Sequence, residues 1–152
     1  YLMAKKSGIK NLSAFEKRLE KHLVKNPELH VRSLIRRSTT LVEATAKESI
    51  LKGGTGITYQ KYNPRRQHTA SAPDEPPASD TGFLINSISS RVRKKDKEVI
   101  GEVIASAPYA AWLEFGNKEM LESGGARPFM QPALEKNRPK IKRIFKEGGY
   151  VD

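Results

Sequence analysis

A helical pattern of about 25 residues, lying between Asn26-Pro27 and Gly53-Gly54, constrains the fold more than any other feature of the chain. Proline at the first helical position favours a helix start there, and the paired glycines favour a stop. At ~1.5 Å per residue the helix is about 37 Å long, which is long for a small domain. Apolar and small residues follow one broad stripe, at Val31, Leu34, Ile35, Leu41, Val42, Thr45 and Ile50.

The segment before this helix predicts another helix. Ser13 and Glu16 have the spacing of a capping box. Apolar residues then recur every three or four positions, as one helical face requires, at Leu12, Phe15, Leu19 and Leu23. We therefore expect two helices joined by a short turn over residues 12–52, after a flexible arm at 1–11.

Length and composition exclude several classes of protein. The 152 residues suit a single domain, which we expect to span 1–152. No run approaches the ~20 apolar residues of a membrane helix, and no secretory signal opens the chain, so we expect no membrane partner. The absence of cysteine excludes disulfides, thiolate catalysis and cysteine-ligated zinc.

The positive charge is concentrated in the first half of the chain. Of a net charge of +11, residues 1–66 hold 15 basic and 5 acidic groups, whereas residues 67–152 hold 13 and 12. This excess favours contact with a polyanion or with an acidic protein surface. A solvated helix face that keeps the protein soluble is the alternative interpretation.

Residues 53–80 are rich in glycine, proline and small polar residues, and we expect them to form a long extended loop without regular structure. Tyr59 and Tyr62 lie among Arg65 and Arg66, a mixture that could stack on bases and contact phosphates. An arm that orders against a neighbouring subunit fits the same residues, and we favour it. The prolines that exclude a helix here are Pro73, Pro76 and Pro77.

Residues 81–147 predict an α+β core, and 148–152 a loose tail. We expect a short helix at 83–90 with Asp80 as its N-cap, then a hairpin with strands at 90–94 and 99–106. A helical segment ends at Gly116, and a last helix begins at Pro128 or Pro132 with a kink at Pro139. The expected fold is therefore N-terminal long helices and a small antiparallel hairpin, packed by a short helix and a C-terminal helix.

Signals of catalysis are weak. His22, His30 and His68 lack the spacing of metal ligands, and no nucleophile or phosphate-binding motif is present. Asp74, Glu75 and Asp80 are clustered, but they lie in a proline-rich loop, so we interpret them as turn-forming residues. We expect no enzyme activity, no metal and no cofactor.

Three stretches carry a more specific signal. They are HTASAPDEPPASDTGFLINSI at 68–88, APYAAWLEFG at 107–116 and ARPFMQPAL at 126–134. In this order and spacing they resemble the HK97 gp10-like family of tailed-phage proteins, described as tail-completion, neck or head–tail joining proteins. The resemblance implies a structural virion protein that forms a ring, expected to be six-fold, at the head-proximal end of the tail.

The resemblance also implies partners and a location. The partners would be copies of the chain itself, a head connector or stopper protein, and the tail tube or a tail terminator, with DNA passing through the lumen. The protein would be found in the virion neck or tail, and in the host cytoplasm during assembly. A basic nucleic-acid-binding protein without sequence specificity is the alternative function, and a small hydrolase or nuclease is a third.

The candidate interface combines residues of these three stretches with residues of the loop that precedes them. Large apolar side chains at 109–115 would pack either in the core or against a neighbour. Glu114 lies among aromatics, where an unpaired charge is costly, so we expect a partner for it, with Arg127 as the candidate. The candidate interface residues are Tyr59, Tyr62, Arg65, Arg66, His68, Pro73, Pro76, Pro77, Trp112, Glu114, Phe115, Arg127 and Phe129.

Overall fold

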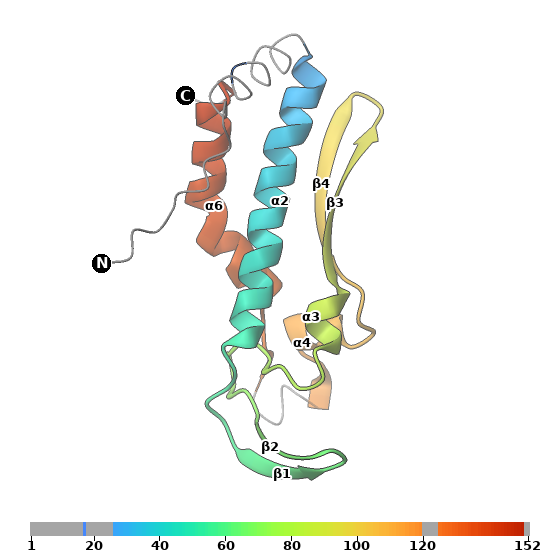
Figure 1. The fold of residues 1–152 in the computed structure, drawn as a ribbon, viewed down its shortest axis with the longest axis vertical. Coiled ribbons are helices and arrows are strands. Elements are labelled where there is room, and N and C mark those ends of the chain that lie inside the picture. Colours follow the sequence, from blue (N-terminus) through green and yellow to red (C-terminus); the bar gives the residue numbers. More distant parts are fainter. Residues whose placement is uncertain (1–16, 18–25, 120–124, 151–152) are drawn as a thin grey trace, which may run out of the picture.

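A computed structural model of the chain describes residue 17 and residues 26–119 and 125–150 (Figure 1). The expected arm at 1–11 and the first helix with its capping box lie outside the described residues. The elements follow in the order of an α+β fold, as predicted. They are α2 (Pro27–Leu51), β1 (Thr58–Tyr62), β2 (Arg65–Thr69), α3 (Phe83–Ser87), β3 (Ile88–Lys95), β4 (Glu98–Ala105), α4 (Ala110–Phe115) and α6 (Met130–Glu147).

The long helix α2 forms the centre of the molecule. It has 25 residues and begins at Pro27, with Asn26 in the N-cap position, as the sequence predicts. The Asn26 side chain makes no capping hydrogen bond. In Figure 1, α6 runs along one side of α2 and the β3–β4 hairpin runs along the other. One helix therefore supplies packing surface for most of the fold.

The β3–β4 hairpin is antiparallel, with Lys95 opposite Glu98 across a two-residue turn. Its first strand starts at Ile88 rather than at the expected Ser90, because α3 ends at Ser87 and the chain turns directly into the strand. Gly101 of β4 lies against α2. A Cβ atom there would lie 2.5 Å from the Ile35 Cγ2 atom, so glycine is what lets the hairpin approach the helix closely.

The last helix starts at Met130, between the two prolines at which a start was expected, and ends before Gly148. Pro139 lies inside it, and the helix continues through that residue while bending along its length (Figure 1). The buried Asn137 side chain donates to the Thr45 Oγ1 atom of α2 at 2.8 Å. This polar contact holds the two helices in one register.

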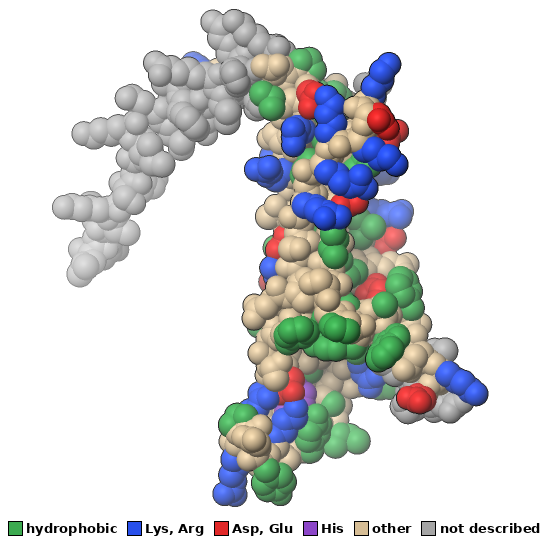
Figure 2. Space-filling model, turned by 90° about the vertical axis from the view of Figure 1, so that its right-hand side faces the viewer, with side chains coloured by type: hydrophobic (Ala, Val, Ile, Leu, Met, Phe, Trp, Pro, Cys, Tyr) green, Lys and Arg blue, Asp and Glu red, His purple; other side chains and the backbone are tan. Residues whose placement is uncertain are grey.

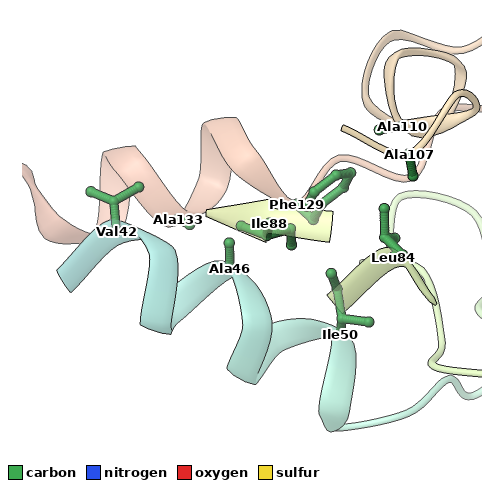
Figure 3. Packing of buried hydrophobic residues seen from close by; sticks show 9 residues of the cluster. All are labelled: Val42, Ala46, Ile50, Leu84, Ile88, Ala107, Ala110, Phe129 and Ala133. Carbon is green, nitrogen blue, oxygen red and sulfur yellow. The ribbon is translucent and has the colours of Figure 1, made fainter. Parts of the chain in front are cut away.

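The core is small and lies along the C-terminal half of α2, which contributes Val42, Ala46 and Ile50. Phe129, Ile50 and Ile88 are its largest fully buried apolar side chains. Figure 3 shows side chains of α2 facing those of β3 and α6, with α3 and α4 closing one end. The buried cluster consists of Val42, Ala46, Ile50, Leu84, Ile88, Ala107, Ala110, Phe129 and Ala133.

The prediction that residues 53–80 lack regular structure is wrong for the first half of the segment. Strands β1 and β2 pair from Thr58↔Thr69 to Tyr62↔Arg65 and form a second, separate two-stranded sheet. The hairpin projects from the base of the molecule, beyond the end of α2 (Figure 1). Both strands are polar on both faces, so they lack the apolar alternation by which a strand is recognised in sequence.

Candidate assembly surfaces

The projecting β1–β2 hairpin contains five of the candidate residues, which are Tyr59, Tyr62, Arg65, Arg66 and His68. Tyr59 and His68 are cross-strand partners whose ring centres lie 5.5 Å apart in an edge-to-face arrangement. Tyr62 and Arg65 form the last pair at the tip, where Tyr62 is 82% exposed. An isolated two-stranded hairpin is only marginally stable in water, so its contacts with the rest of the chain matter.

A single carboxylate ties the hairpin to the body. Asp80, just before α3, accepts hydrogen bonds from Lys61 of β1 and Arg66 of β2, and His68 Nδ1 lies 3.9 Å from it. The Asp80 carbonyl oxygen accepts a further hydrogen bond from Arg66, at 2.8 Å. The hydrogen bond from Lys61, followed by the charges of Arg66 and Lys61, lowers the pKa of Asp80. The carboxylate is therefore held in its charged form.

This position corrects the prediction for Asp80. The N-cap of α3 is Gly82, with φ +78°, and Asp80 does not cap the helix. The conformation at Gly82 is one that side-chain-bearing residues rarely adopt, which explains why glycine stands there. Asp80 is thus more than a turn-forming residue, because its side chain holds the β1–β2 hairpin in place.

The proline-rich loop that follows the hairpin is bound to its own chain. The Glu75 carboxylate accepts hydrogen bonds from the backbone N–H of Thr55 at 3.0 Å and of Ala72 at 2.9 Å. The hydrogen bond from the Thr55 hydroxyl is the largest cause of a lowered pKa of Glu75. Pro73 is exposed, Pro76 is half-buried and Pro77 is buried. The loop is therefore held by contacts within its own chain.

A second surface lies on α4 and beside it. Trp112 is 59% exposed and Phe115 is 76% exposed, while Ala110 faces the core. Phe83 of α3 lies 6.2 Å from Tyr109 between ring centres, and both side chains are also exposed. Figure 2 shows hydrophobic side chains gathered on the lower half of one face, whereas Lys and Arg side chains are densest at the upper end and occur again at the lower tips. These exposed aromatic side chains make this face a candidate for contact with another protein.

Glu114 has a partner, as predicted, but the partner is not Arg127. Its Oε2 atom accepts from the backbone N–H of Phe129 and of Met130, both at 2.9 Å, and its Oε1 atom accepts from Gln131 at 2.8 Å. A carboxylate at this place satisfies the unpaired N–H groups of the first turn of α6 and faces the positive end of the helix dipole. The Arg127 side chain donates instead to the Ser71 carbonyl oxygen, at 3.4 Å.

Phe129 belongs to the core and not to these surfaces. It is 1% exposed, so it is not available for contact with another molecule, and we remove it from the interface residues. No motif in the sequence marks Lys61 and Asp80 as a pair, although they hold the hairpin. Their opposite charges, 19 residues apart, were the only signal, and that signal does not specify a partner.

Among the described residues, no three His, Cys, Asp or Glu side chains come together as metal ligands would. Within the same ranges, none of the helices combines the length and the apolar character of a membrane span. The features that stand out are therefore the hairpin and the exposed aromatic side chains.

Comparison with known proteins identifies the family. Residues 13–116 match the HK97-gp10-like family, described as a bacteriophage tail component. The chain belongs to this family. The match includes the first two of the three stretches singled out in the sequence, and it stops before the third, at 126–134. Neither the curated proteins nor the solved structures contain a significant match. Membership in the HK97-gp10-like family makes the chain a structural tail component of a phage virion.

Proposed function

We propose that this tail component assembles with copies of itself into a ring at the head-proximal end of the tail, and that the ring joins the tail to the head connector. The observation that carries the proposal is the β1–β2 hairpin, which projects from the body and is held there by Asp80. A ring needs two different complementary surfaces on each subunit. The hairpin is one such surface, and the exposed aromatic face at α4 offers another.

The finer parts of the proposal are expectations that membership in a tail-component family supports. A six-fold ring, a head connector or stopper on one side and the tail tube or tail terminator on the other are proposed here for this chain. The protein would be made in the host cytoplasm and carried in the virion neck.

Electron microscopy of a phage with this gene deleted tests the joining role. We expect filled heads beside detached tails, and whole particles after the purified protein is added. Tails of abnormal length would assign the protein to termination of tail growth. Intact, infectious particles made without the gene would contradict the proposal.

The structure gives less support to nucleic-acid binding by the hairpin. Two of its three cations, Lys61 and Arg66, already pair with Asp80. Arg65 is the remaining arginine, and it forms no ion pair within the described residues. DNA binding would show an affinity that falls steeply with salt, since each neutralised phosphate releases counterions. Tight, salt-sensitive binding of duplex DNA to the wild-type chain would restore this alternative.

A further inference from the structure

The core of the molecule is open on one side. A groove of about 500 Å³ lies between α2, β4 and α6, with α4 at its end. Val42 in its floor is a member of the core cluster, and Val103, Met130 and Ile141 pack against that cluster. In the walls, Leu134 is 43% exposed and Phe115 is more exposed still. This apolar groove is therefore a continuation of the core that the described residues leave uncovered.

The tip of the β1–β2 hairpin has the side chains that suit such a groove. Tyr62 and Arg65 lie opposite each other as the last cross-strand pair. Tyrosine and arginine are two of the three residue types most often found at the energetic centres of protein interfaces. Here they stand together at the end of a projecting element, and both are exposed to solvent. Within one chain, neither contributes to the core.

The charges of the two surfaces are complementary. The chain has a net charge of +11, yet among the described residues the single charged side chain that lines the groove is the Glu114 carboxylate. Among the described residues its Oε1 atom accepts one hydrogen bond, from Gln131, although a carboxylate oxygen can accept two. An arginine brought to the groove would find this acceptor. Arg65 has no ion pair within the same residues.

We propose that the hairpin tip of one copy docks into the apolar groove of the next, with Tyr62 entering the groove and Arg65 donating to the Glu114 carboxylate. Asp80 holds the hairpin so that it projects away from α2 and α6, which line the groove of its own chain (Figure 1). A second copy must therefore supply the tip. The contact joins two different surfaces, which is the geometry that closes rings. This inference rests on the proposed ring and names the contact within it.

Disulfide trapping tests the contact directly, because the chain contains no cysteine of its own. In the full chain, Y62C is combined with L134C, and the protein is oxidised at high concentration. We expect covalent multimers whose linked peptides, found by mass spectrometry, join position 62 of one copy to position 134 of another. The matched control is K97C with L134C, which places the cysteine at the tip of the other projecting hairpin.

The following outcomes of the trapping experiment would overturn the proposal. Absence of the 62–134 link, or equal trapping by the control, shows that the hairpin does not occupy the groove. A disulfide within one chain between F15C and L134C shows that the chain's own N-terminal segment covers it. Ring formation is measured separately, by electron microscopy of the wild-type protein. Rings without the 62–134 link contradict this contact alone, whereas a head–tail junction that forms without the protein contradicts the proposed function.

Alanine substitutions at the hairpin tip test the contact by a second measurement, the strength of subunit association. Y62A and R65A change exposed side chains, so the melting temperature should stay near that of the wild type. We expect each to weaken subunit association by about 30-fold, the loss typical of a residue at the centre of an interface. K97A is the control and should associate as the wild type does. Unchanged association in both tip variants would contradict the contact.

Discussion

At the scale of single residues, three carboxylates connect separate segments of this structure through hydrogen bonds. Glu114 replaces an absent cap on α6, Asp80 holds the β1–β2 hairpin, and Glu75 ties two loops together. Each of them accepts two or more hydrogen bonds from groups far away in sequence. A carboxylate is suited to this because its two oxygens can accept several donors at once.

Replacing Glu114 with alanine should destabilise the protein. The three amides of the first turn of α6 lose their acceptor, and we expect the free energy of unfolding to fall by about 2 kcal/mol, as for loss of a strong cap. Urea denaturation measures the change. E135A, on the exposed face of the same helix, is the control. Equal stability of E114A and E135A would contradict the capping role. Because Glu114 does not pair with Arg127, adding R127E to the E114R variant should not restore its stability.

Glu102 of β4 should titrate far below an ordinary glutamate. Hydrogen bonds from Arg93 and then from Arg91 lower its pKa from 4.5 to about 2. Because the folded-state pKa is lowered, the contribution of this contact to stability is present above pH 4.5 and is lost as the pH falls through about 2. NMR titration of the Glu102 carboxyl carbon checks this. R93A should raise the midpoint, K97A should leave it unchanged, and a wild-type midpoint near 4.5 would contradict the pairing.

At the scale of elements, the two hairpins differ in what stabilises them. The β3–β4 hairpin packs along α2, with Gly101 allowing close approach. The β1–β2 hairpin instead depends on Asp80 and on the hydrogen bond from the Gly56 N–H to the Ala70 carbonyl oxygen, at 2.9 Å. An element held by a few polar contacts opens locally without unfolding of the core.

D80N should therefore loosen the β1–β2 hairpin selectively. The amide keeps the size of the side chain but loses its charge, and so weakens the contacts with Lys61 and Arg66. We expect hydrogen exchange at residues 58–69 to speed up several-fold, with little change in α2 and α6. D74N makes the same chemical change in the neighbouring loop and is the control. Equal protection in D80N and the wild type would show that other contacts hold the hairpin.

At the scale of the whole molecule, the small core and the exposed aromatic side chains belong together. Phe129 supports the fold, whereas Trp112 and Phe115 face solvent on the short helix α4. A subunit that leaves apolar surface uncovered gains stability when another copy covers it. Among these aromatic side chains, folding and assembly are thus expected to use different residues.

Substituting Phe129 in the core and Trp112 on the surface separates the role in folding from the role in assembly. F129A should lower the free energy of unfolding by about 3–5 kcal/mol, since it leaves a cavity in the core. W112A should change it by less than about 0.5 kcal/mol but should weaken assembly. Thermal denaturation and sedimentation of the same samples measure the two effects. A strongly destabilised W112A, or one that assembles as the wild type does, would contradict the division.

The elements that have local signals could be predicted from the sequence alone. Pro27 and the glycines after Leu51 bound α2, the charged turn at Asp96 marks the β3–β4 hairpin, and Gly116 ends α4. These signals act on the backbone of the residues that carry them, so no knowledge of packing is needed. The family was recognisable for the same reason, since its motifs are contiguous stretches of sequence.

Which of the candidate residues are exposed, and so available for assembly, could not be predicted without the packing of the elements. Helix α4 has six residues, less than two turns, so its pattern cannot tell an exposed Trp112 from a buried one. Phe129 is as apolar as Phe115, yet one lies in the core and the other in solvent. The partners of Asp80 and Glu114 lie 14 to 19 residues away. Burial and pairing of this kind depend on how separate elements pack, and no short stretch of sequence contains that information.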